Sequence, residues 1–177
     1  MMSTEPPAAE ASDDLAVVLA DEFAQWFRNL VARGDPLPRA FSGVTQDGRQ
    51  EIVILTGLPL DHVQRRDFMI WLCQKEQFIA YAYGTHVGVL EDSGTDSEAM
   101  EIFASSDRYD VNKTLGIEMQ TDGTIRLFDQ YYVVRPAGQG NRIFLGLQRS
   151  KSLPSEANDF FRQFCVDLSV RVISLQR

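Results

Sequence analysis

The longest β-strand signal in the chain is the run QFIAYAYGTHVGVLE at residues 77–91. Because side chains alternate across a strand, these residues divide between two faces. One face has small side chains at its centre, at Ala80, Ala82 and Gly84. The other carries the β-branched and aromatic residues that suit a pleated surface, namely Ile79, Tyr81, Tyr83, Thr85, Val87 and Val89. We expect this strand to be central, with the rest of the chain packed around it.

The small face of this strand leaves two interpretations open. A face without bulky side chains lets a helix approach closely, and helix packing is the usual arrangement in layered domains. Alternatively, the face is hollow and binds a small molecule, with Ala82, Gly84 and His86 as the ligand-binding residues. In that case His86 is the polar group best suited to contact the ligand, whereas under helix packing it is a core histidine.

Two segments have the pattern of helices. Residues 15–31 place apolar side chains at three- and four-residue spacing after Asp14, an N-cap candidate, and a Gly-Asp-Pro stop follows them. The second helix begins after Asp61, which forms a capping box with Gln64, and runs to about residue 75. Its C-terminal half, FMIWLC, is apolar on most sides, which predicts a position against the sheet.

Strand signals separate these helices. Runs at 39–45 and 51–56 flank an Asp-Gly pair, which is a strong hairpin signal. Further strands are expected at 99–105, 113–120 and 124–134, and residues 106–112 read as a polar loop.

The register of one hairpin can be predicted. A three-residue loop at 121–123 sets Met119 opposite Ile125 and Ile117 opposite Leu127, so that apolar faces match. A two-residue turn would place Met119 opposite an arginine instead, and a one-residue slip of this kind moves side chains to the wrong face. The three-residue loop requires Gly123 in the left-handed conformation.

The C-terminal part predicts an edge strand and a helix. Residues 142–148 form a last short strand, which we place at an edge of the sheet. Ser155 is expected to cap a final helix, with an apolar stripe of Phe160, Phe161, Phe164, Cys165, Leu168 and Val172. Three phenylalanines within five positions exceed what one narrow stripe needs. We therefore expect Phe160, Phe161 and Phe164 at a two-fold interface, and the alternative is that all three close the core.

The order of these elements predicts the fold class. Consecutive strands joined by tight turns form antiparallel pairs, so we expect an α+β fold with a curved antiparallel β-meander. The N-terminal, central and C-terminal helices are expected mainly on one side of it. Residues 1–12 are rich in Ala, Pro, Ser and Glu and predict a disordered tail, and residues 13–177 predict a single domain.

The stretch from residue 47 to residue 91 resembles small bacterial and phage-associated α+β proteins of unassigned function. The shared features are a hairpin ending in an apolar strand, DGRQEIVILTGLPL, then a helix, then a strand beginning FIAYAYG. Many of those proteins carry Glu then Trp near the end of that strand, where this chain has Tyr83 and Gly84. The resemblance implies a shared architecture and carries no function to this chain.

The charge and the cysteines restrict partners and compartment. The net charge is −8, with 10 basic and 22 acidic side chains in residues 1–134 against 7 basic and 3 acidic in residues 135–177. An acidic body disfavours binding to a nucleic-acid backbone, so we expect no nucleic acid as a partner. No apolar run reaches the length of a membrane span, and no signal-peptide pattern starts the chain. Two well-separated cysteines predict reduced thiols, and together these features favour the cytoplasm without membrane contact.

No motif in the chain indicates a chemical reaction. The sequence lacks G-x-S-x-G, the Walker A loop and H-E-x-x-H, and its two histidines have no carboxylates at ligand spacing. We therefore expect no metal and no cofactor, and the sequence identifies no catalytic residue. The preferred hypothesis is a non-enzymatic protein-interaction module, dimeric and chaperone-like in one form, because small acidic α+β dimers that bind unfolded proteins share this composition. The alternatives are a small-molecule-binding protein that uses the small face of strand 77–91, and an enzyme of unrecognised type.

Overall fold

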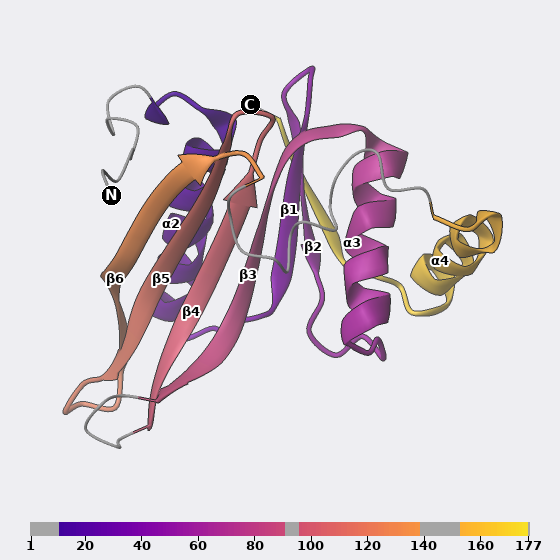
Figure 1. Cartoon of the computed structure of the whole chain (residues 1–177). Helices are drawn as coiled ribbons and strands as arrows, with labels where there is room; N and C mark the ends of the chain where they lie inside the picture. The colour runs from indigo at the N-terminus through magenta and orange to yellow at the C-terminus, as the bar shows by residue number, and fades with distance from the viewer. Residues whose placement is uncertain (1–10, 91–95, 139–152, 177) are drawn as a thin grey trace.

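The computed structural model of the chain describes residues 11–90, 96–138 and 153–176. Within these residues it contains three helices and a seven-stranded antiparallel sheet, so the expected α+β class is confirmed (Figure 1). The helices are α2 (Leu15–Ala32), α3 (His62–Glu76) and α4 (Ser155–Asp167). The strands are β1 (Ala40–Thr45), β2 (Arg49–Ile54), β3 (Phe78–Leu90), β4 (Asp96–Ser105), β5 (Tyr109–Met119), β6 (Ile125–Pro136) and β7 (Val172–Gln176).

The sheet has the order β6-β5-β4-β3-β1-β2-β7 and is open at both ends. Strands β3 to β6 form the expected meander, and the β1–β2 hairpin lies on the other side of β3. Strand β3 is therefore in the middle of the sheet, as expected for residues 77–91. It pairs with β1 on one side and with β4 on the other.

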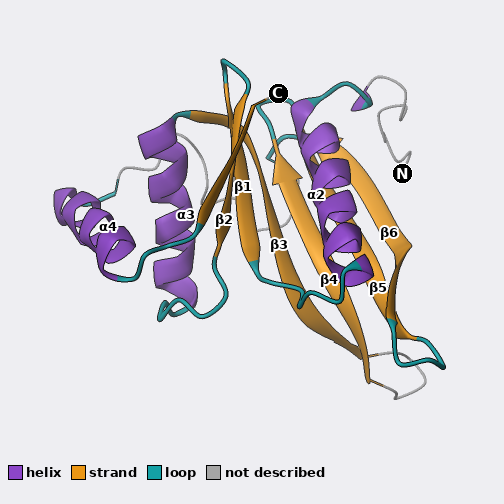
Figure 2. Ribbon diagram, turned by 180° about the vertical axis from the view of Figure 1, so that it is seen from behind, coloured by secondary structure: helices purple, strands orange, loops and turns teal. Residues whose placement is uncertain are grey.

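The helices divide between the two faces of the sheet, rather than packing mainly on one side as we expected (Figures 1 and 2). Helix α2 covers β3 to β6 on one face, while α3 contacts β1 and β3 from the opposite face and α4 packs against α3. The reason is that central strands are apolar on both faces. Ala40 and Ile52 belong to the core under α2, whereas their neighbours Phe41 and Val53 belong to the core under α3.

Local signals set the N-terminal ends of α2 and α3 as predicted, whereas Ser155, expected as a cap, is the first residue of α4 and follows Pro154 as N-cap without a side-chain hydrogen bond. The Asp14 carboxylate accepts a hydrogen bond from the Ala16 amide at 2.9 Å and caps α2. At α3, the Asp61 carboxylate accepts from the Gln64 amide at 2.8 Å, and the Gln64 side chain accepts from the Asp61 amide at 3.0 Å. The predicted capping box is therefore confirmed.

The predicted β5–β6 hairpin register is also confirmed. Met119 pairs with Ile125, and Ile117 pairs with Leu127. Gly123 has φ of +83° and its amide donates to the Gln120 carbonyl, so the three-residue loop forms with the expected left-handed glycine.

Two strands start earlier than predicted. Strand β4 begins at Asp96 rather than at residue 99. Strand β5 begins at Tyr109 rather than at residue 113, within residues 106–112, which were expected to form a polar loop. Tyr109 and Val111 alternate into the core under α2, and the Ser105 hydroxyl donates to the Asp110 carboxylate at 2.6 Å across the turn. Asp110 and Asn112 lie on the opposite face of the strand and are half-buried, so polarity alone was misleading.

The C-terminal segment differs from the prediction. Helix α4 ends at Asp167, and Val172, expected on a final helix, instead begins β7, which pairs with β2. Ser169 has φ of +48°, which breaks the helix, and the β-branched pair Val172-Ile173 suits a strand. The strand expected at 142–148 lies outside the described residues. So does the tail up to residue 10, but Ala11 is buried in the core under α2.

Candidate functional site

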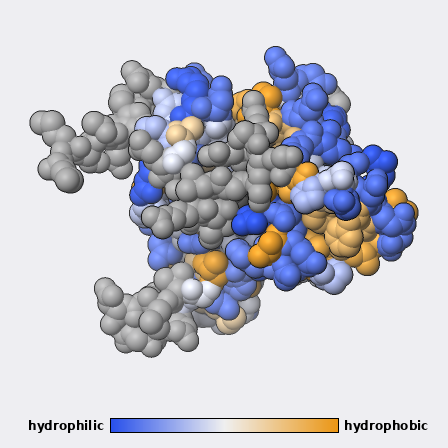
Figure 3. Space-filling view, turned by 45° about the vertical axis from the view of Figure 1, so that its right-hand side comes forward, coloured by the Kyte–Doolittle hydropathy of each residue, from blue (hydrophilic) through white to orange (hydrophobic). Residues whose placement is uncertain are grey.

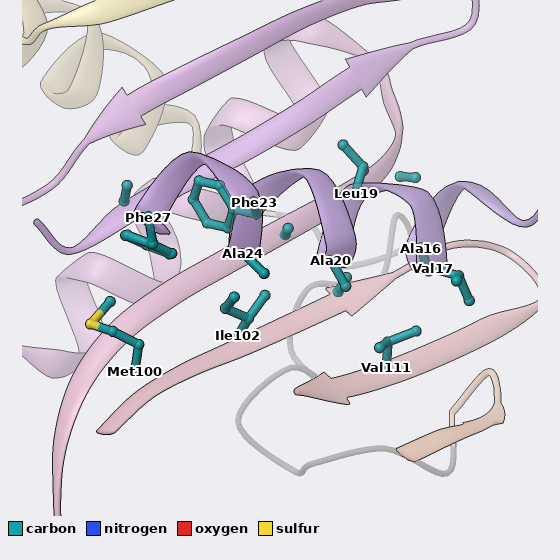
Figure 4. Packing of buried hydrophobic residues seen from close by; sticks show 14 of the residues in the cluster. Ala16, Val17, Leu19, Ala20, Phe23, Ala24, Phe27, Met100, Ile102 and Val111 are labelled. Atoms are coloured by element: carbon teal, nitrogen blue, oxygen red, sulfur yellow. The ribbon is translucent and has the colours of Figure 1, made fainter. Parts of the chain in front are cut away.

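The small face of β3 is filled by α2. A Cβ added at Gly84 would lie 2.5 Å from Cε2 of Phe27 and 3.1 Å from Cε1 of Phe23. Ala82 is fully buried in the same core, and Figure 4 shows Phe23 and Phe27 projecting from α2 into this layer. The helix-packing interpretation therefore applies to Ala82 and Gly84. Neither has room for a ligand above it, which corrects their assignment as ligand-binding residues.

His86 has a different environment from these two residues. Helix α2 has 18 residues and is about 27 Å long, whereas β3 has 13 residues and is about 43 Å long. The sheet consequently extends past the C-terminal end of the helix, and His86 lies in this overhang with its side chain 46% exposed. It is neither a core histidine nor a neighbour of a hollow at Ala82.

A cavity of about 660 Å³ lies in the overhang, between the end of α2, the loop after it and four strands. We call it the His86 cavity. Its walls are Val31, Ala32, Arg33, Gly34, Asp35, Pro36, Leu37, His86, Glu98, Ile117, Gly123, Thr124 and Ile125. The apolar side chains come from both layers, and the polar ones lie on the loop and at the strand ends.

The titratable side chains of the His86 cavity lie in two pairs. Arg33 Nε donates to the Asp35 carboxylate at 3.0 Å, so these two loop residues neutralise each other. His86 Nε2 and Glu98 Oε2 are 3.6 Å apart, which is too long for a hydrogen bond. The Glu98 side chain is 66% exposed and retains capacity to accept hydrogen bonds.

A second cavity of about 630 Å³ lies between the C-terminal end of α3 and the β1–β2 hairpin. Its main charged group is Arg49, which contacts Glu51 and donates to Glu76 at 2.9 Å. Burial raises the pKa of Glu51, and Glu76 adds to the effect. Burial also acts to raise the pKa of Glu76, but hydrogen bonds from Lys75 and Arg49 lower it overall. The two carboxyls shift in opposite directions because Glu76 contacts two cations.

This arrangement is typical of a structural ion network. Arg49 contacts Glu51 of its own strand β2 and Glu76 of α3, so the second contact links β2 to α3 and the guanidinium is engaged within the protein. Cys73 lines the same cavity and is buried.

Two candidate nucleophiles, Cys165 and Tyr81, lie in environments that raise their pKa. Burial raises the pKa of the Cys165 thiol, and reactive cysteines instead need a lowered pKa. Burial likewise raises the pKa of the Tyr81 hydroxyl, although its hydrogen bond to Ser105 acts in the opposite direction. In the part of the chain that the structure describes, no group of three or more His, Cys, Asp or Glu side chains could hold a metal ion.

The three phenylalanines of α4 have different surroundings. Phe161 is buried, with its ring 5.4 Å from Phe68 and 5.8 Å from Trp71 on α3. Its assignment to an interface is therefore corrected to the core. Phe164 is half-buried with its ring 5.6 Å from Phe68, whereas Phe160 is 52% exposed.

Further apolar side chains are exposed at the C-terminal end of α4, six and eight residues after Phe160. Val166 is 68% exposed and Leu168 is 43% exposed, and Figure 3 shows apolar side chains at the surface on the side that carries α4. We call Phe160, Phe164, Val166 and Leu168 the α4 surface. Helix α4 is held on α3 by the Phe161 contacts and by a hydrogen bond from Trp71 Nε1 to Asn158 Oδ1 at 3.0 Å.

Sequence reasoning missed two parts of these sites. Glu98 was not singled out, because the β3–β4 pairing places it near His86 and nothing in its local sequence does. The surface exposure of Val166 was also missed, although its position off the stripe of Phe161 could have indicated it.

Comparison with protein-family models, curated proteins and solved structures finds no match to this chain. Among the described residues, the helices are too short or too polar to cross a membrane.

Proposed function

We propose that this chain is a non-enzymatic protein-interaction module that associates with a second copy of itself through the α4 surface. The observation that carries the proposal is the exposure of Phe160 and Val166 on α4, and of Leu168 at its C-cap, while the buried side of this helix already packs on α3. Large apolar side chains at one surface are typical of the centre of an interface.

The surroundings of the α4 surface support self-association. Val172 of β7, on the face of the sheet that α3 covers, is also exposed, at 47%, and β7 is an edge strand among the residues that the structure describes. Helix α4 carries both signs of charge, with Asp159 and Arg162 on exposed positions. Two copies related by a two-fold axis present the same patch to each other, so mixed charges around an apolar centre can pair across it.

The proposal includes a chaperone-like role as one form of the module. An exposed aromatic side chain such as Phe160 also suits contact with apolar segments of an unfolded protein. Self-association is the primary proposal, because it requires no partner beyond the chain itself.

Sedimentation equilibrium of the wild type and of Phe160→Glu tests self-association. We expect a dimer for the wild type and a folded monomer for the variant, because a carboxylate at the centre of the interface would be desolvated without a partner. Met119→Glu is the matched control. Met119 is 75% exposed at the β5–β6 turn, on the opposite side of the molecule from α4, so this variant is expected to remain dimeric (Figure 1).

Two results would overturn the proposal. One is a wild type that stays monomeric as its concentration is raised. The other is a Phe160→Glu variant that dimerises as tightly as the wild type.

A further inference from the structure

We infer that the His86 cavity binds a small primary amine with a branched or cyclic hydrocarbon body, with Glu98 as the group that accepts the ammonium. This site is separate from the α4 surface, so the inference stands independently of the proposed function.

The shape follows from the mismatch between helix and sheet. Helix α2 ends at Ala32, while β3, β4 and β5 continue beyond it. The chain then turns at Gly34, with φ of +75°, and crosses the overhang through Pro36 and Leu37. A Cβ added at Gly88, on the same face of β3 as His86, would meet no atom within 4 Å. The sheet therefore has uncovered surface at this end, in contrast to Gly84 beneath Phe27.

The walls of the cavity are apolar on both sides. Val31, Leu37 and Ile117 are partly buried side chains that adjoin the core under α2. Ile125, on β6, is 42% exposed and closes the far side. A volume of about 660 Å³ lies within the range of small-molecule sites, which are mostly apolar with a few polar groups that fix orientation.

The register of the sheet places Glu98 within reach of these walls. Glu98 pairs directly with Ile117, and Ile117 pairs with Leu127, so the carboxylate and an apolar wall residue are neighbours on the same face. A ligand whose hydrocarbon part contacts Ile117 can therefore bring a polar end to Glu98.

The charge of the cavity selects a cation. Arg33 and Asp35 neutralise each other, so the Glu98 carboxylate and the His86 imidazole 3.6 Å from it are the other titratable side chains of the lining, and Glu98 is the one that supplies negative charge. The C-terminal end of α2 adds partial negative charge from its carbonyl groups. An ammonium group gains a charge-assisted hydrogen bond at Glu98, whereas a carboxylate ligand is repelled.

The experiment uses the full chain and three probes of similar shape: cyclohexylmethylamine, the neutral cyclohexylmethanol and the acidic cyclohexylacetate. Binding is measured by calorimetry, and amide chemical shifts locate the bound probe. We expect the amine to bind with shifts concentrated at Val31, Leu37 and Ile117. The alcohol should bind about tenfold more weakly and the acid more weakly still.

Two variants assign the charge. Glu98→Gln should weaken amine binding about tenfold and leave alcohol binding unchanged. Glu118→Gln is the matched control, because Glu118 is an exposed carboxylate on the opposite face of β5 and should leave both affinities unchanged. Equal binding of amine and acid would overturn the inference, as would an unchanged amine affinity in Glu98→Gln. The absence of amine binding to the wild type, or shifts centred elsewhere, would do the same.

Discussion

Gly84 of β3 and Phe27 of α2 are in contact because Gly84 lacks a side chain. A methyl group at residue 84 would lie 2.5 Å from the Phe27 ring, which is closer than real carbon atoms approach. Phe27 is fully buried, so its ring cannot move into solvent. This contact sets how closely the helix lies on the sheet, and it decides between packing and ligand binding at the small face.

The first prediction concerns this contact. Gly84→Ala should destabilise the protein by about 1–3 kcal/mol, because the added methyl overpacks the core. Gly88→Ala is the matched control on the same strand and face, where an added Cβ meets nothing, and it should change stability by less than about 0.5 kcal/mol. Urea unfolding followed by circular dichroism measures both. Equal stability of the two variants would contradict the contact.

The second prediction concerns pH. The folded-state pKa of Glu76 lies below its ordinary value of 4.5, so its carboxylate stabilises the fold above about pH 4.5 and this contribution is lost as pH falls through the folded pKa. Glu76→Gln should therefore cost about 1 kcal/mol at pH 7 and progressively less in acid. Unfolding measured at a series of pH values gives the difference between wild type and variant. A difference that is constant across the acid range would contradict the assignment.

Glu51 provides the contrast to Glu76. Its folded-state pKa is raised, chiefly by burial, so its protonation stabilises the fold at low pH and this contribution is lost as pH rises through the folded pKa. Glu51→Gln should therefore cost less at pH 7 than Glu76→Gln. The same unfolding series measures both variants.

The third prediction concerns the start of α3. Asp61→Ala removes the carboxylate that accepts from the Gln64 amide and should cost about 1 kcal/mol. His62→Ala, at the next and equally exposed position, leaves both hydrogen bonds of the capping box in place and should be nearly neutral. Thermal unfolding compares the two variants, and a larger loss for His62→Ala would contradict the capping role.

The fourth prediction concerns β7. Ile173 pairs with Ile52 and packs against the core under α2, so Ile173→Ala should cost about 1–2 kcal/mol. Leu175 lies on the same face of this strand but is 44% exposed, and Leu175→Ala should cost less than about 0.5 kcal/mol. Chemical unfolding of both variants checks the placement. Equal losses would argue against Ile173 as a core contact.

Local patterns determined much of the fold because their causes are local. The Asp61–Gln64 capping box forms within four residues, and the 121–123 loop follows from matching apolar faces around a left-handed glycine. The alternation at residues 78–90 predicted a central strand. A strand with small and apolar side chains on both faces is stable only when other elements cover both of those faces. These features need no knowledge of distant residues.

The tertiary structure alone decided which face each helix covers and where the candidate sites lie. Ala82 and His86 are four residues apart on one face, yet α2 covers the first and ends before the second. Phe160 and Phe161 are adjacent in sequence, but the packing of α4 on α3 buries one ring and exposes the other. The β2–β7 pairing joins segments more than a hundred residues apart in sequence. Burial depends on which segment lies opposite, and that is a property of long-range packing that no local pattern carries.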